Sequence, residues 1–184
     1  MSIFKENVQT ELRKITVENY RECLDLKVTE QQSTFVATNA VSLAEAGIFR
    51  YESLPFAVYA GNQMVGFVML SYDEKKFHYG LWRLMIDQRF QGRGFGKAAL
   101  QLSIDYLIEE FQAGEIYLTV ERENKAAKQL YASFDFEPTG KTEDGEDEMC
   151  LVTGEPIRMP APEPKKRAKP GPKPRSRYWP FDMF

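Results

Sequence analysis

A short glycine-rich turn joins an apolar segment to a long amphipathic one near the middle of the chain. The apolar segment, which ends in Leu84, Met85 and Ile86, predicts a strand, and residues 95–111 predict a helix because apolar side chains recur at helical spacing. A turn that opens directly into a helix aims several free backbone amides at one point, where the positive end of the helix dipole also lies. This arrangement is typical of a phosphate-binding loop at the end of a strand.

The spacing of the glycines separates the known kinds of phosphate loop. Gly92, Gly94 and Gly96 allow unusual backbone angles and close approach of a ligand. The Walker pattern fails because its final Gly-Lys-Ser/Thr is absent, and the dinucleotide pattern G-x-G-x-x-G fails because these glycines alternate. The spacing that remains is Gln91-x-x-Gly94-x-Gly96. Positive side chains surround the turn: Arg89, Arg93 and Lys97.

This spacing resembles the acetyl-CoA loop of the GCN5-related N-acetyltransferases, the GNAT superfamily. The resemblance implies that the pyrophosphate binds backbone amides of Gln91, Gly92, Arg93, Gly94, Phe95, Gly96 and Lys97. It also implies that the backbone of Leu84, Met85 and Ile86 pairs with the pantetheine arm, and that one amide there supports the thioester oxygen. Taken alone, the three apolar side chains are interpreted as part of the core, so that only their backbone is expected to be functional.

A second segment resembles the N-x-x-A-x-x-L-Y pattern of the same superfamily. Asn124 and Tyr131 are separated by about two helical turns, so both lie near one face of a helix predicted over residues 124–134. The resemblance implies that Asn124 binds the CoA arm and that Tyr131 protonates the leaving thiolate, although a tyrosine on an apolar helix face is also an ordinary core residue. Asp135 stands where the family usually has glycine, and aspartate tolerates the left-handed bend expected there.

The remaining elements complete a recognisable order. Strands are expected at residues 12–17, 55–59, 64–72, 77–86, 115–120 and 148–152, and helices at residues 18–26, 95–111 and 124–134. A Gly61-Asn62 turn predicts a hairpin, and Ser42 with Glu45 predicts a capping box that starts a short helix. The order resembles the GNAT fold over about residues 12–152. That fold is an α/β structure with a central mixed, mostly antiparallel sheet, flanking helices and splayed strands around the CoA site.

Charge and composition divide the chain at about residue 154. Residues 155–184 contain eight Lys or Arg and three Asp or Glu, a net +5, which leaves −8 for residues 1–154. We therefore expect an acetyltransferase domain over 1–154 and a basic, proline-rich extension over 155–184, solvated rather than packed. The acidic domain favours cationic substrates and disfavours nucleic acid, which the tail is expected to bind only weakly, although the negative charge is also explained by solubility.

Several classes of site have little support. Cys23 and Cys150 lack the spacing of a zinc or thioredoxin motif, and His78 is the single histidine, so no metal is expected. No apolar run reaches the roughly 18 residues of a membrane span, and no apolar signal segment opens the chain. We therefore expect a cytoplasmic protein without membrane contact. The sequence leaves homodimer formation open.

Two stretches of the sequence indicate which amine accepts the acetyl group. Residues 29–43 and 81–87 resemble bacterial spermine/spermidine (diamine) N-acetyltransferases, which implies a polyamine acceptor such as spermidine or spermine. Carboxylates and aromatic faces suit such polycations, and the candidate binding residues are Glu30, Glu52, Tyr79, Trp82 and Glu148.

The sequence does not identify the general base that takes a proton from the amine. Gly80 stands where some family members have a glutamate, so the base is water or one of four side chains: Glu30, His78, Tyr79 and Glu148. The alternatives for function are acetylation of a protein amine or an aminoglycoside, and a CoA-holding nucleic-acid accessory protein that uses its basic tail.

Overall fold

A computed structural model of the chain describes residues 9–49, 52–73, 77–143 and 145–154. The expected basic extension over 155–184 lies outside the described residues. The first half comprises β1 (Thr10–Lys14), α1 (Tyr20–Asp25), the 3₁₀ turn η1 (Glu30–Gln32), α2 (Asn39–Ile48), β2 (Ser53–Ala60), β3 (Gln63–Asp73) and β4 (His78–Ile86). The second comprises α3 (Phe95–Phe111), β5 (Glu115–Glu121), α4 (Lys125–Ala132), β6 (Glu137–Glu143) and β7 (Glu146–Val152).

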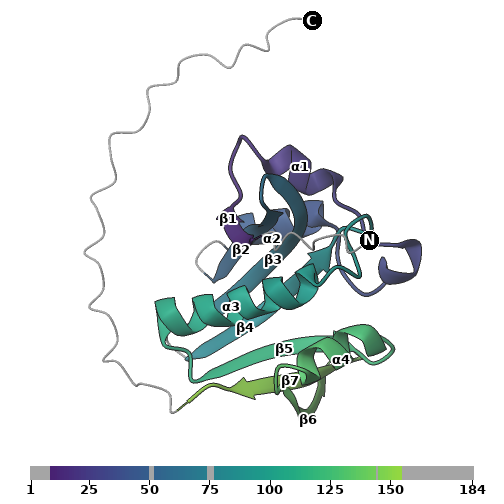
Figure 1. Cartoon of the computed structure of the whole chain (residues 1–184). Helices are drawn as coiled ribbons and strands as arrows, with labels where there is room; N and C mark the ends of the chain where they lie inside the picture. Colours follow the sequence, from purple (N-terminus) through teal and green to yellow (C-terminus); the bar gives the residue numbers. More distant parts are fainter. Residues whose placement is uncertain (1–8, 50–51, 74–76, 144, 155–184) are drawn as a thin grey trace, which may run out of the picture.

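The strands form one mixed sheet in the order β1-β2-β3-β4-β5-β7-β6 (Figure 1). Neighbouring strands are antiparallel except β4 and β5, which are parallel and are joined through α3. The expected mixed, mostly antiparallel sheet with flanking helices is therefore confirmed. The hairpin at Gly61-Asn62 is also confirmed, because β2 and β3 pair on either side of it.

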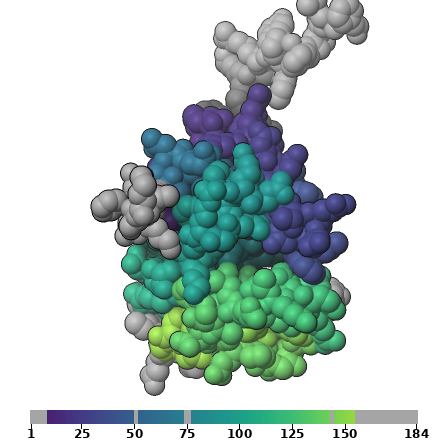
Figure 2. Space-filling view, turned by 45° about the vertical axis from the view of Figure 1, so that its right-hand side comes forward, coloured from purple at the N-terminus to yellow at the C-terminus, as the bar shows by residue number. Residues whose placement is uncertain are grey.

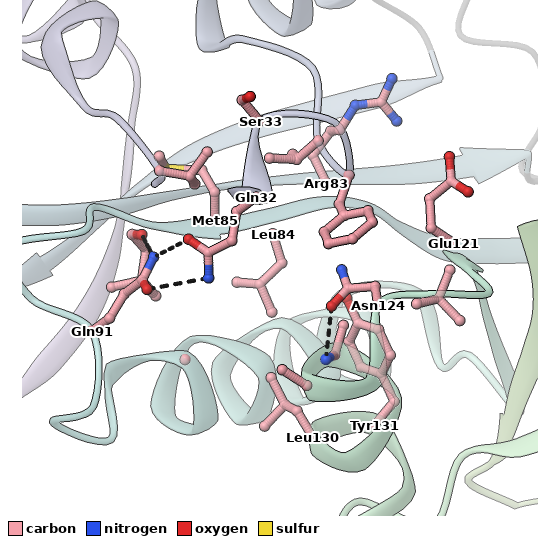
Figure 3. Close-up of a pocket in the computed structure, with 18 of the residues that line it drawn as sticks. Gln32, Ser33, Arg83, Leu84, Met85, Gln91, Glu121, Asn124, Leu130 and Tyr131 are labelled. Atoms are coloured by element: carbon pink, nitrogen blue, oxygen red, sulfur yellow. Dashed lines mark hydrogen bonds between the residues drawn. The ribbon is translucent and has the colours of Figure 1, made fainter. Parts of the chain in front are cut away.

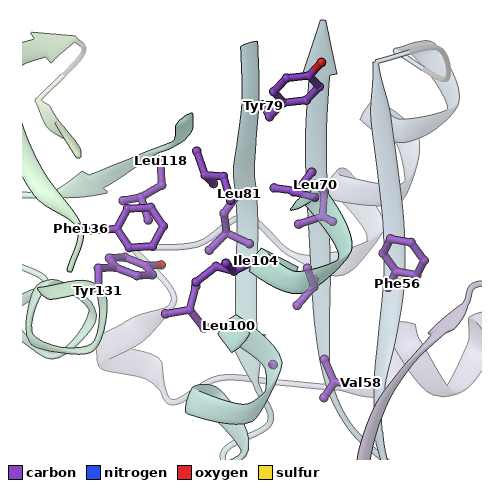
Figure 4. Close-up of a cluster of buried hydrophobic side chains, with 14 of the residues drawn as sticks. Phe56, Val58, Leu70, Tyr79, Leu81, Leu100, Ile104, Leu118, Tyr131 and Phe136 are labelled. Carbon is purple, nitrogen blue, oxygen red and sulfur yellow. The ribbon is translucent and has the colours of Figure 1, made fainter. Parts of the chain in front are cut away.

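Helices cover both faces of the sheet, and each face has its own apolar cluster. On one face, α3 and α4 pack over β-strand side chains such as Leu81 and Leu118 (Figure 4). On the other, α1 and α2 pack over Phe67, Met69 and Met85. Seven consecutive residues of β3 are buried because both faces of that strand are covered. The covered centre of the sheet therefore gives β4 a rigid support.

The parallel pair β4–β5 separates soon after it forms. Only Tyr79, Gly80 and Leu81 pair with β5, opposite Ile116, Tyr117 and Leu118. On its other side, β4 stays paired with β3, but the register shifts where Leu70 pairs with Leu81 and Met69 with Arg83, so Trp82 is the extra residue of a bulge. The two strands thus diverge beyond Trp82. Figure 2 shows a groove between the green C-terminal part and the rest of the molecule.

Several local predictions need correction. Ser42 does not cap a helix: α2 starts one turn earlier with Thr38 as its cap, whose side chain accepts from the Val41 amide at 3.4 Å, while Ser42 is buried inside the helix. The prediction followed a Ser-x-x-Glu spacing that also occurs within helices. The expected strands also lack a counterpart of β6. Asp135 has a φ of 63°, so the left-handed bend is confirmed there.

The described part of the chain contains no helix long and apolar enough to cross a membrane. It also contains no group of three or more His, Cys, Asp and Glu side chains placed to hold a metal ion.

Candidate active site

A cleft of about 590 Å³ occupies the space where β4 and β5 diverge. Its walls come from the end of β4, the turn into α3, the end of β5, the start of α4 and residues 32–37 after η1. These elements are far apart in sequence, and their side chains surround the cleft from several directions (Figure 3). The parallel crossover places the C-terminal ends of β4 and β5 at the same end of the sheet. The predicted cofactor residues Leu84, Met85, Ile86, Gln91, Gly92, Phe95, Gly96 and Asn124 all line this cleft, as does Tyr131.

The end of β4 presents one free backbone edge to the cleft. Leu84 and Ile86 pack toward α3, whereas Met85 is buried on the opposite face. Their backbone pairs with β3 on one side, and β5 has already diverged on the other. The apolar side chains therefore pack against the core. The backbone edge that no strand pairs with is available to an extended amide-bearing ligand, apart from the Ile86 carbonyl, which accepts from the Gln91 side chain.

The turn after β4 supplies amides without intrahelical partners. Gly92 and Gly94 have φ angles of 72° and 88°, which a residue with a side chain rarely adopts. Gly94 precedes α3, and the first intrahelical bond runs from the Ala98 amide to the Gly94 carbonyl at 3.1 Å, so the amides of residues 95–97 have no intrahelical partner and are available to an anion. Arg93, Gly94 and Lys97 are exposed outside the cleft lining.

Asp87 fastens the base of this turn. The side chain is 1% exposed and accepts from the Lys27 and Arg89 amides, each at 2.9 Å, and from the Arg89 guanidinium at 2.7 Å. Burial alone would raise the pKa of Asp87, but the Arg89 side chain and the two amides outweigh it, so this pKa lies below its ordinary value. Arg89, expected as a free rim charge, is thus committed to Asp87.

Gln91 ties the turn to the opposite wall through a residue that sequence reasoning missed. Its side-chain amide donates to the Ile86 carbonyl at 2.8 Å and to Gln32 Oε1 at 2.9 Å, and Gln32 donates back to Gln91 at 3.2 Å (Figure 3). Gln32 also closes a capping box with Thr29. The Thr29-x-x-Gln32 spacing is a signal for that box, but nothing in the sequence indicates that it faces Gln91.

Helix α4 places Asn124 and Tyr131 on the cleft wall opposite β4. The Asn124 side chain caps α4 by accepting from the Ala127 amide at 3.1 Å. Tyr131 is 8% exposed and its ring lies 6.0 Å from that of Phe136. Burial, followed by the negative charge of Glu146, raises the pKa of Tyr131 to about 12. The phenol therefore stays protonated at neutral pH, as a proton donor must.

A second cavity of about 420 Å³ adjoins the cleft, and Trp82 and Thr119 line both. Three carboxylates line it: Glu52, Asp73 and Glu148. Aromatic side chains surround them: Phe49, Tyr72, Trp82 and Tyr117, with the His78 ring stacked on that of Tyr117 at 4.8 Å. The bulge at Trp82 and the divergence beyond Leu118 thus join the two spaces at one point.

Glu148 is a carboxylate of this cavity that two neighbouring side chains hold in place. It accepts from Thr139 at 2.8 Å and pairs with Lys141 at 3.2 Å. Desolvation would raise the pKa of Glu148, but these two partners outweigh it and hold this pKa below its ordinary value. The carboxylate therefore stays ionised and attracts a cation.

Two predicted acceptor residues lie elsewhere. Tyr79 is 6% exposed and packs on the α3 face, where its ring centroid lies 5.6 Å from that of Phe111. Alternation along β4 points Tyr79 to the face opposite the second cavity. Glu30 is an exposed residue of η1 and lines neither space. Of the acceptor candidates, Glu52, Trp82 and Glu148 come together.

Opposite charges lie on different parts of the cleft wall. Free amides and the dipole of α3 make one end attractive to phosphate, whereas Glu121 and Glu146 line the β5–β7 side. The arrangement can hold an extended ligand with its anionic part at α3 and its reactive end near Trp82 and Thr119. A cationic group in the second cavity would then meet that end.

Comparison with known proteins agrees with this geometry. The acetyltransferase (GNAT) family model matches residues 11–136. A spermine/spermidine N(1)-acetyltransferase of Bacillus subtilis (strain 168) is 32% identical over 136 residues, which cover 71% of this chain and 89% of the relative. The N-alpha-acetyltransferase RimI of Mycobacterium tuberculosis is 31% identical over 83 residues, which cover 44% of this chain and 50% of the relative.

Solved structures share the fold. A crystal structure of spermidine N-acetyltransferase from Vibrio cholerae in complex with CoA and spermine has a TM-score of 0.65 and 20% identity to this chain. The match covers 79% of this chain and 96% of that protein.

Proposed function

The chain belongs to the acetyltransferase (GNAT) family, and we propose that it moves the acetyl group of acetyl-CoA onto a primary amine of a polyamine such as spermidine or spermine. Acetyl transfer follows from the family. The choice of acceptor is the proposal, and one observation carries it: a cavity with three carboxylates and several aromatic faces opens onto the cleft at Trp82 and Thr119.

A flexible polycation suits this cavity for two physical reasons. The negative charge of the carboxylates attracts ammonium groups, and aromatic faces attract cations at about 0.5–2 kcal/mol each. A monoamine delivers its single nitrogen to the reaction and leaves these groups unused, whereas a polyamine places a second nitrogen among them. The relative from Bacillus subtilis, named for spermine and spermidine, supports the same acceptor.

In this proposal the cofactor residues keep the roles that the resemblance implied. The pyrophosphate binds free amides of the turn before Ala98, and the pantetheine arm pairs with the free edge of β4 at Leu84 to Ile86. The Asn124 amide nitrogen remains available to the arm, because its oxygen is used by the cap. These contacts place the thioester near Trp82 and Thr119.

The chemistry is direct attack within a ternary complex. The neutral amine forms a bond to the thioester carbon, and a β4 amide supports the oxygen as it becomes negative. Collapse of the intermediate breaks the carbon–sulfur bond. Tyr131 then supplies the proton that the thiolate needs, and its raised pKa keeps that proton in place until the sulfur leaves.

The test is a panel of amines assayed by release of the CoA thiol. Spermidine and spermine should show a higher kcat/KM than butylamine, and their advantage should shrink as salt rises, because exposed charges are screened beyond about 10 Å at 0.1 M salt. Glu148→Gln should raise KM for spermidine and leave KM for butylamine nearly unchanged. Glu30→Gln is the matched control, since Glu30 is exposed and lines neither space.

Other outcomes assign other acceptors. A peptide amine preferred over spermidine would replace the polyamine by a protein N-terminus. Equal rates for spermidine and butylamine would refute the polyamine proposal and leave the acetyltransferase assignment intact.

A further inference from the structure

We infer that Glu146, held by the hydroxyl of Thr119, accepts the proton that the acceptor amine must lose before it attacks. This inference rests on the proposed function, because it concerns the amine that the second cavity delivers to the cleft. No glutamate occupies the position of Gly80 on β4, where some family members carry one, so a proton acceptor must come from another element.

Thr119 marks the place where the amine and the thioester meet. It lines both the cleft and the second cavity, and it follows directly after Leu118, the last β5 residue paired with β4. The Thr119 hydroxyl donates to Glu146 on the adjacent strand β7. Glu146 itself lines the cleft and is half-buried. The bond therefore holds the Glu146 carboxylate beside Thr119.

The charge on Glu146 reaches the proposed proton donor. It contributes to the raised pKa of Tyr131, second to burial. The proposed proton acceptor and the proposed proton donor thus line the same cleft, Glu146 from β7 and Tyr131 from α4. This is the placement that the reaction needs, since the nitrogen loses protons and the sulfur gains one.

The other charged groups around Glu146 are less suited to accept the proton. Glu121 is the β5 register partner of Glu146 and lies two residues along that strand from Thr119, and Glu148 lies in the second cavity, bound by Thr139 and Lys141. His78 stacks on Tyr117 beyond the paired part of β4. Arg83 lines the cleft from β4, where it pairs with Glu45. The cations Arg122 and Lys128 are held by Asp147.

Glu146 takes one proton from the ammonium group and passes it to water, and the neutral nitrogen then bonds to the thioester carbon. The carbon–sulfur bond breaks, Tyr131 gives its proton to the sulfur, and the second proton of the nitrogen returns to Tyr131. The products are the acetylated amine, the CoA thiol and one proton in solution.

The experiment compares Glu146→Gln with the wild type on two amines, spermidine and trifluoroethylamine, which is neutral at the assay pH. With spermidine, kcat should fall about 10²-fold, the usual lower limit for loss of a general base. With the neutral amine, the kcat values of the two proteins should differ by less than about threefold. Raising the pH should reduce the loss of kcat that the variant shows with spermidine. Thr119→Val should also lower kcat with spermidine, by a smaller factor than Glu146→Gln, and leave kcat with the neutral amine nearly unchanged.

Controls separate the roles of charge, fold and function. Glu109→Gln, on the exposed side of α3, removes one negative charge and should leave both rates unchanged. CoA affinity and melting temperature verify that the Glu146→Gln variant folds. If that variant does not fold, Thr119→Val tests the same proton acceptor. Three results would overturn the inference. Glu146→Gln could keep the wild-type kcat, or it could lose the same factor in kcat with both amines. The third is that Glu121→Gln, rather than Glu146→Gln, shows the loss of kcat that depends on the amine. A wild type inactive on every amine would refute the proposed function first.

Discussion

Replacing Gly96 by alanine should stabilise the protein and weaken its hold on CoA. Gly96 is the second residue of α3, and its backbone is outside the left-handed region. An added Cβ would lie 3.8 Å from both Ile86 Cγ1 and Leu130 Cδ2, which is ordinary van der Waals contact. Gly94 is a poorer choice, because its φ of 88° would add strain to any effect on binding.

The two effects have opposite signs. Alanine limits the unfolded chain and favours the helix, so the free energy of unfolding should rise by about 0.4–1 kcal/mol. For a chain of this size the melting temperature then rises by about 1–4 °C. The new methyl group projects between two cleft walls and holds the phosphate away from the amides. Loss of one hydrogen bond to a charged group costs about 1.5–3 kcal/mol, so CoA should bind about 10- to 150-fold more weakly.

Calorimetry with CoA and a thermal melt measure the two effects on the same sample. Gly47→Ala is the matched control, because Gly47 is an exposed residue of the helix α2 with no atom within 4 Å of an added Cβ. It should raise the melting temperature similarly and leave CoA affinity unchanged. A Gly96→Ala protein that binds CoA as the wild type does would show that the pyrophosphate does not approach this turn.

Three further changes test other parts of the site. Tyr131→Phe should lower kcat about 10²-fold with little effect on stability, and the wild type should lose no activity to Tyr131 ionisation until the pH nears about 12; a thiol-release assay with full rate for the variant would assign the proton to another donor. Asp87→Asn should cost about 1–3 kcal/mol of stability at neutral pH. The pKa of Asp87 is depressed in the folded protein, so this stabilisation is present above the ordinary aspartate pKa and is lost as the pH falls through the folded value. The free energies of unfolding of wild type and variant, measured in urea, should therefore converge in acid. A difference in these free energies that stays constant with pH would contradict this. Gln32→Leu should weaken CoA binding about 2- to 10-fold, the effect of one ordinary hydrogen bond, and unchanged affinity in calorimetry would mean that the Gln91 turn is held without it.

The sequence predicted the cofactor side of the site better than the acceptor side, and the reason is physical. The turn and α3 are local structures, so glycine spacing and helical periodicity determine them within one segment. The bounds of α3 agree with the expected residues 95–111. Asn124 and Tyr131 are similarly related by one helix, and both line the cleft.

The acceptor side depends on contacts between distant strands. Tyr79 and Trp82 are three residues apart on one strand, so alternation puts Tyr79 in the core and Trp82 at the second cavity. The bulge at Trp82 shifts the alternation of the residues that follow, so that Leu84 and Ile86 return to the α3 face. Glu146 and Thr119 meet only through the pairing of β5 with β7. Neither the bulge nor this pairing has a signal within one segment.

A competition experiment tests the central claim most directly. Acetyl-CoA is supplied with equal concentrations of spermidine, butylamine and a short peptide with a free N-terminus, and the acetylated products are counted by mass spectrometry at low conversion. Their ratio is the ratio of the kcat/KM values, which defines specificity. If the second cavity binds the free end of a polyamine, acetylspermidine should exceed each of the other products by at least about tenfold, or 1.4 kcal/mol. Equal amounts of the three products, or an excess of acetylated peptide, would contradict the polyamine acceptor.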